Sequence, residues 1–145
     1  MSKALKRNFE KGQKVYVVDY WGKAFGVCAK IVEVQKETQI FRALLYGKTY
    51  RKYSFKDYGT LIFDTLEEVQ KAAERVPKPR TAIYHLTNSG QICKKIVVAV
   101  DGQIIDGTYN LIIHLNRGKS ALIEEIGESL FVNECDARMR SKKAT

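Results

Sequence analysis

The chain has 145 residues, and its 25 Lys and Arg against 16 Asp and Glu give a formal net charge of +9. Hydrophobic residues make up 45% of it, enough for a core in a chain that buries roughly two thirds of its unfolded surface, which excludes intrinsic disorder. No apolar run approaches the roughly 18 residues of a membrane span, and no charged start leads into an apolar signal segment. We therefore expect a cytoplasmic protein without a membrane partner.

The first half of the chain predicts short strands followed by a helix. Runs of β-branched and aromatic residues indicate strands at residues 14–19, 27–34, 40–46 and 60–63. Apolar residues then recur at helical spacing, and Asp64 and Glu67 can cap each other's backbone amides. We therefore expect a helix over residues 65–75 that is capped by Asp64 and ended by Pro77 and Pro79.

The same order of elements returns after the prolines. Strands are expected at residues 83–87, 92–100, 108–115 and 129–132, and Asn133 can cap a final basic helix. Similar residues align the two halves at offsets of 65, 68 and 69: residues 28–32 with 93–97, Tyr16 with Tyr84, Gly59 with Gly127, and residues 61–64 with 130–133. These matches favour an internal duplication over the alternative, a chance resemblance between two β-rich segments.

Short strands that end in a helix predict a mainly β (α+β) fold, a tandem pair of small SH3-like antiparallel barrels that each end in a short helix. The opening of the module at residues 9–18 and its close at residues 58–69 resemble the small SH3-like or KOW-like barrel proteins of phages and mobile elements. This resemblance covers residues 9–76 and implies a small barrel of phage type. The second half departs from it, because its loop at residues 88–90 is shorter than the loop at residues 20–25.

The expected domains follow from this reading. They are a basic N-terminal tail at residues 1–8, a first barrel with its helix at 9–76, a Pro-containing linker at 77–80, and a second, diverged barrel with a basic C-terminal tail at 81–145. The expected first core comprises Phe9, Val15, Val17, Ile31, Val34, Leu44, Leu61, Phe63 and Leu66. The expected second core comprises Ile83, Ile96, Val98, Leu111, Ile113, Leu130, Val132 and Met139.

The sequence contains no motif for catalysis or metal binding. Cys28, Cys93 and Cys135 are far apart and form no C-x-x-C pair, so we expect buried, reduced thiols. His85 and His114 lie in apolar strand contexts, which favours structural histidines. Neither a phosphate-binding glycine loop nor a nucleophile motif such as G-x-S-x-G occurs. We therefore expect no catalytic residue, metal, cofactor or small-molecule substrate, and a protein that is not an enzyme.

Basic and aromatic residues alternate in the middle of the first half. Cations that neutralise phosphates, beside rings that stack on bases, are typical of a nucleic-acid groove. The predicted binding site comprises Lys48, Arg51, Lys52, Lys56, Tyr50, Tyr53, Trp21 and Lys23. The alternative is a half-buried strand, with its rings turned inward, its charges turned outward and no ligand.

These observations favour a non-enzymatic basic binding module that contacts nucleic acid or a nucleoprotein complex. A positive field of this size attracts polyanions and acidic protein surfaces alike. The alternative is therefore a protein–protein module, an inhibitor from a phage or mobile element, of anti-CRISPR kind, that binds and blocks a host defence nuclease. The sequence leaves DNA, RNA and acidic protein open as partners.

Overall fold

The computed structural model describes residues 8–144, with side chains through residue 142. Its residues form two compact units. Of the described residues, the first contains residues 8–76 together with 102–110, and the second contains residues 77–101 together with 111–144. The division after Val76 coincides with the predicted linker. Residues 102–110 were expected in the second domain and instead cluster with the first unit. The predicted tail at residues 1–8 lies outside the described residues except for Asn8.

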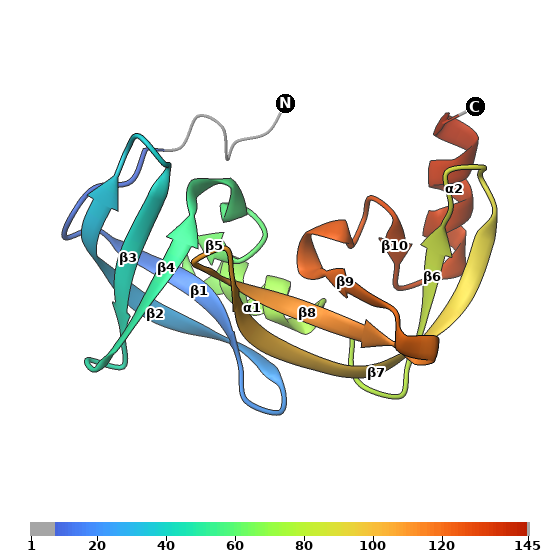
Figure 1. The fold of residues 1–145 in the computed structure, drawn as a ribbon, viewed down its shortest axis with the longest axis horizontal. Coiled ribbons are helices and arrows are strands. Elements are labelled where there is room, and N and C mark those ends of the chain that lie inside the picture. The colour runs from blue at the N-terminus through green and yellow to red at the C-terminus, as the bar shows by residue number, and fades with distance from the viewer. Residues whose placement is uncertain (1–7, 145) are drawn as a thin grey trace. The chain divides into compact units, whose positions relative to one another are not determined.

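The first unit is a five-stranded antiparallel sheet with one helix (Figure 1). Its strands are β1 (Lys14–Tyr20), β2 (Ala24–Gln35), β3 (Ile40–Leu45), β4 (Thr49–Ser54) and β5 (Ile62–Phe63), in the spatial order β4-β3-β2-β1-β5. A 3-10 turn, η2 (Phe55–Asp57), follows β4, and helix α1 (Leu66–Glu74) follows β5. The predicted strands and helix of this half are therefore present.

The second unit repeats this plan. Its elements are β6 (Ala82–Leu86), β7 (Ile92–Ile105), β8 (Thr108–Leu115), η3 (Asn116–Gly118), β9 (Ser120–Leu122), η4 (Ile123–Glu125), β10 (Leu130–Phe131) and helix α2 (Glu134–Ala144). The spatial order β10-β6-β7-β8-β9 is the order of the first sheet, strand for strand. The described residues are mainly β with two helices, and neither sheet closes on itself. The hairpin tip between β7 and β8 belongs to the first unit.

Equivalent hydrogen bonds show which residues of the two units correspond. The bond from Gly59 N to Ile62 O (2.8 Å) has its counterpart in that from Gly127 N to Leu130 O (2.7 Å), at an offset of 68. On β2, Ile31 O accepts from Gly12 N at 2.7 Å, and on β7, Val97 O accepts from Arg80 N at the same distance. Val97 is therefore the counterpart of Ile31, and the offset between these two strands is 66. The shared strand order and bonding support a duplication. Two of the three offsets read from the sequence, 65 and 69, are wrong by one residue.

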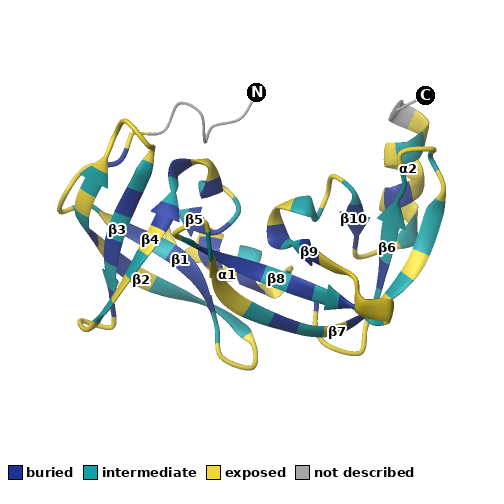
Figure 2. Ribbon diagram, viewed as in Figure 1, coloured by how far each residue is buried: buried dark blue, intermediate teal, exposed yellow. Residues whose placement is uncertain are grey.

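That one-residue error explains most of the wrong core predictions in the second half, because adjacent strand residues face opposite sides of a sheet. Ile96 and Val98 are exposed, whereas Val97 and Val100 are buried. Three more of the predicted core residues are exposed: Leu66, Val132 and Met139. Another three are half-buried: Val34, Leu44 and Phe63. The confirmed core residues are Phe9, Val15, Val17, Ile31, Leu61, Ile83, Leu111, Ile113 and Leu130. Figure 2 shows buried residues along β1 and β8.

The N-cap residues of the two helices also correspond at an offset of 68, where the sequence predicted 69. In α1 the N-cap is Thr65, whose side-chain oxygen accepts from Glu68 N at 3.2 Å, and the predicted Asp64 cap is wrong. Asp64 instead accepts a hydrogen bond from the hydroxyl of Tyr58. In α2 the predicted cap is confirmed, because Asn133 Oδ1 accepts from Asp136 N at 2.8 Å. At the offset of 68, Thr65 and Asn133 occupy equivalent positions.

Other sequence expectations can be placed on the structure. The three cysteines are free thiols, but Cys28 and Cys135 are exposed, so the expectation that the thiols are buried is wrong for these two. His114 lies on β8 with its Nε2 atom 3.3 Å from Asp101 Oδ2. Within residues 8–144 no helix is long and apolar enough to cross a membrane.

Candidate nucleic-acid interface

A buried carboxylate organises one end of the first unit. Asp19 follows Val15 and Val17 on the inner face of β1, and its side chain is inaccessible to solvent. Its Oδ1 atom accepts from Arg51 Nη1 at 2.8 Å and from the hydroxyl of Tyr109 at 3.2 Å. Tyr109 lies in the segment of residues 102–110 that belongs to this unit, so Asp19 ties that segment to the sheet.

Arg51 serves this internal network. Its guanidinium pairs with Asp19 and lies 4.2 Å from the centre of the Tyr109 ring, and only 14% of the side chain is exposed. Tyr53, two residues further along β4, is fully buried and packs its ring against Phe41 at 5.7 Å. The sequence predicted that both residues belong to the binding site, but in the structure neither is accessible to a partner. The alternation of β4 turns both of them inward, as expected for a half-buried strand.

The ionisation of the network follows from its contacts. Burial by itself would raise the pKa of Asp19, but hydrogen bonds from Tyr46, Arg51, Tyr20 N and Trp21 outweigh this and lower it. Burial would lower the pKa of Arg51, and the bond to Asp19 raises it overall. Burial and the bond to Asp19 raise the pKa of Tyr46 to about 12. Asp19 and Arg51 are therefore a charged pair at neutral pH, beside a neutral tyrosine.

Two exposed aromatic rings are anchored on the same carboxylate. Asp19 Oδ2 accepts from Trp21 Nε1 at 2.9 Å and from the hydroxyl of Tyr46 at 2.5 Å. Trp21 is nevertheless 70% exposed and Tyr46 is 46% exposed. Each ring has one polar atom fixed inside the protein while much of its surface remains open to solvent.

The turns that carry these rings are tight and end in lysine. Tyr46 and Gly47 both have positive φ, 58° and 68°, and Lys48 N donates to Leu45 O at 3.1 Å within the three-residue loop that joins Leu45 to Thr49. A tyrosine rarely adopts this conformation, and its bond to Asp19 stabilises it. Lys23 lies in the loop between β1 and β2 beside Trp21, and both Lys23 and Lys48 are exposed.

The outer face of the sheet, opposite the face on which Asp19 lies, carries further aromatic and basic side chains. Tyr50 and Lys52 alternate with the inward residues of β4, and both are exposed. The Arg42 guanidinium lies 4.9 Å from the centre of the Tyr50 ring and its Nε is 3.7 Å from Glu33 Oε1. We call the exposed set of Trp21, Lys23, Tyr46, Lys48, Tyr50 and Lys52 the aromatic–basic surface.

Strand register adds lysines that the sequence analysis did not include in the site. Lys14 pairs with Lys30 across β1 and β2, and Lys30 pairs with Leu44, which pairs with Tyr50. These four residues therefore form one row on the outer face. Period-two alternation on the predicted strands at residues 14–19 and 27–34 contains this signal, but only the pairing register places the row beside Tyr50.

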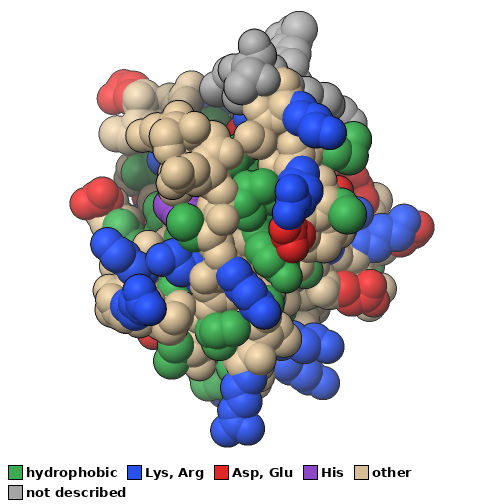
Figure 3. Space-filling model, turned by 90° about the vertical axis from the view of Figure 1, so that its right-hand side faces the viewer, with side chains coloured by type: hydrophobic (Ala, Val, Ile, Leu, Met, Phe, Trp, Pro, Cys, Tyr) green, Lys and Arg blue, Asp and Glu red, His purple; other side chains and the backbone are tan. Residues whose placement is uncertain are grey.

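One predicted site residue lies elsewhere. Lys56 is exposed in η2, which follows the last residue of β4. Lys48 directly precedes the first residue of β4. In an antiparallel sheet these are opposite ends, so the structure does not bring Lys56 to the aromatic–basic surface. On the face drawn in Figure 3, lysines and arginines lie among acidic and hydrophobic side chains.

Among the described residues, no three His, Cys, Asp or Glu side chains gather in a way that could hold a metal ion. The aromatic–basic surface offers exposed aromatic rings and lysine ammonium groups. A comparison of the sequence with models of protein families finds no match, and a comparison with curated proteins finds none.

Proposed function

We propose that this protein is a non-enzymatic binding module whose first unit binds single-stranded nucleic acid, free or in a nucleoprotein complex, through the aromatic–basic surface. The observation that carries the proposal is the anchoring of two exposed rings, Trp21 and Tyr46, on the buried carboxylate of Asp19. Rings held in place lose little conformational entropy when a partner binds.

Unpaired bases are the ligand that suits this surface best. Stacking of a base on an aromatic side chain contributes about 1–3 kcal/mol, and neighbouring cations neutralise the phosphates between the bases. Trp21 and Tyr46 are each followed within two residues by an exposed lysine. The net charge of +9 adds a long-range attraction for polyanions.

We further propose that each unit is an open relative of the SH3-like barrels, and that the two arose by duplication of one such module. Five short antiparallel strands, with a 3-10 turn before the last strand and a helix after it, support this in both units. In the first unit this arrangement brings the turns after β1 and β3 to the same end of the sheet, where the rings lie.

The test compares two sets of three exposed lysines in the first unit. The site variant carries Lys23→Gln, Lys48→Gln and Lys52→Gln, and the control variant carries Lys11→Gln, Lys36→Gln and Lys56→Gln. Both remove three charges, but the control residues lie toward the other end of the sheet. Affinity for fluorescent single-stranded DNA and RNA is measured by anisotropy over a range of salt concentrations.

We expect the site variant to lose most of its affinity and the control to lose little. Each phosphate contact contributes about 0.7 to the slope of log K against log salt concentration on single strands. Loss of three such contacts should therefore make the slope of the site variant less steep by about 2. Equal losses in the two variants would mean that net charge alone drives binding, and the proposed surface would be wrong. Thermal unfolding of both variants checks that the fold is retained.

A further inference from the structure

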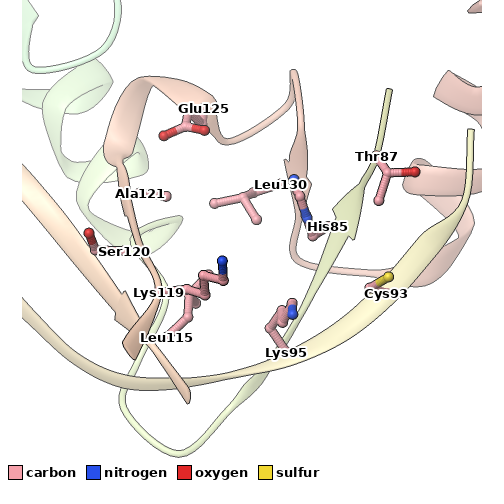
Figure 4. Close-up of a pocket in the computed structure, with 10 residues that line it drawn as sticks. All are labelled: His85, Thr87, Cys93, Lys95, Leu115, Lys119, Ser120, Ala121, Glu125 and Leu130. Atoms are coloured by element: carbon pink, nitrogen blue, oxygen red, sulfur yellow. The ribbon is translucent and has the colours of Figure 1, made fainter. Parts of the chain in front are cut away.

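We propose that the second unit holds a separate binding site for a small organic anion, such as a carboxylate or a phosphate monoester with a small apolar body. The site is a cavity of about 320 Å³ that lies entirely within this unit (Figure 4). Known ligand pockets range from about 300 to 1,000 Å³, so this volume suits a small molecule.

The cavity occupies positions that form the core of the first unit. The pairing of β6 with β7 repeats that of β1 with β2. The pair of Val17 with Val27 has its counterpart in that of His85 with Cys93, so His85 corresponds to Val17. The pair of Val15 with Ala29 has its counterpart in that of Ile83 with Lys95, so Lys95 corresponds to Ala29. Val17 and Ala29 are almost completely buried. Polar side chains have therefore taken the places of core residues in the second copy of the module.

Burying polar groups costs stability unless they find partners. His85 and Lys95 are half-buried where their counterparts are buried, whereas Lys119 is exposed at the cavity rim. The two lysines that line the cavity, Lys95 and Lys119, form no ion pair with any described residue. The carboxylate of Glu125 also lines the cavity, but its oxygens accept from Leu122 N at 2.9 Å and from the Ser129 hydroxyl at 3.3 Å. Two ammonium groups therefore face the cavity with one carboxylate that already has local donors.

Figure 4 shows Lys95, Lys119 and His85 around the hollow, with Glu125 at its η4 side. Apolar surface completes the lining, from the buried side chains of Leu115, Ala121 and Leu130. An anionic head group can accept hydrogen bonds from the lysines while an apolar body packs on the leucines. A purely apolar ligand would leave the lysines without partners, and a cation would be repelled.

The first test is a titration of the full chain with phenyl phosphate, followed in ¹H–¹⁵N correlation spectra, with inorganic phosphate as the head group alone. We expect saturable shifts at cavity residues and weaker binding of inorganic phosphate. Lys95→Ala restores the residue type that the first unit has at this position, and Lys119→Gln removes the second charge. Each should weaken binding about tenfold or more, the loss of one charge-assisted hydrogen bond. Lys94→Gln, on the opposite face of β7, is the matched control.

The second test needs no variant, because Cys93 lines the cavity while Cys28 and Cys135 are exposed elsewhere. Bound phenyl phosphate should slow the alkylation of Cys93 by iodoacetamide and leave the other two thiols unaffected. An unchanged rate at Cys93, or shifts confined to lysines of the first unit, would overturn the proposal. The site variant of the first unit should retain Cys93 protection, so this proposal and the nucleic-acid proposal can fail separately.

Discussion

Asp19 shows how a single buried residue can define a surface. An ionised carboxylate in a protein interior is unfavourable unless charge and hydrogen bonds compensate it, and removal of one partner of a buried pair is more damaging than removal of both. Asp19 has Arg51 as its counter-charge and three aromatic side chains as further donors. The same carboxylate holds the polar ends of the exposed Trp21 and Tyr46 rings.

We therefore predict that Asp19→Asn lowers the free energy of unfolding by about 3–5 kcal/mol, because Arg51 is left as an unpaired, half-buried charge. Urea unfolding at pH 7 measures the loss, and Asp106→Asn, an exposed position in the same unit, should change little. Because the pKa of Asp19 is lowered in the folded protein, its contribution is present above the unfolded value of about 3.9 and is lost as the pH falls below it. A stability difference between Asp19→Asn and wild type that persists unchanged at pH 3 would contradict this assignment.

At the level of elements, the sequence predicted four of the five strands of each sheet, both helices and their repeated order, because alternation and helical spacing are local signals. The predicted strands did not include β4 and β9, the strands at the β3 and β8 edges of the two sheets. The sequence-based alignment of the two halves was wrong by one residue on some strands, and this error changed which residues were predicted to be buried. Identities between residues 28–32 and 93–97 suggested an offset of 65, but hydrogen bonding sets it at 66. Ile96 therefore appeared to be a core residue in place of Val97. The same kind of slip moved the predicted cap from Thr65 to Asp64. Apolar residues on both faces of β7 give no local signal to correct it.

Helix α1 packs on β2 at a glycine, and this contact gives an element-level prediction. A Cβ atom on Gly26 would lie 2.4 Å from Val69 Cγ1. Gly26→Ala should therefore destabilise the protein by about 1–3 kcal/mol through overpacking. Val69→Ala removes the opposing methyl groups, so the double variant should be less destabilised than the sum of the two single variants. Strict additivity in urea unfolding would show that the helix does not rest on this strand as described.

For the whole molecule, the duplication that we propose, followed by divergence, would account for two units that share a strand order and differ in chemistry. The first unit buries apolar side chains at Val17 and Ala29, and the second places His85 and Lys95 there. The sequence predicted a basic, aromatic site on the first half. Five of its eight predicted residues are exposed on the aromatic–basic surface, and Lys56 is exposed elsewhere; the five are Trp21, Lys23, Lys48, Tyr50 and Lys52. It could not show that Arg51 and Tyr53 turn inward, since the partners that hold them, Asp19 and Phe41, are distant in sequence.

The most direct test of the central claim uses the sole tryptophan of the chain, Trp21, which belongs to the aromatic–basic surface. Its fluorescence is followed during titration with a short single-stranded oligonucleotide at low and high salt. We predict saturable quenching, because bases stack on the indole, with an affinity that falls steeply as salt rises. The Lys11, Lys36 and Lys56 control variant should titrate like the wild type. Tight binding of the oligonucleotide that leaves Trp21 emission unchanged, or no binding at either salt concentration, would contradict the account.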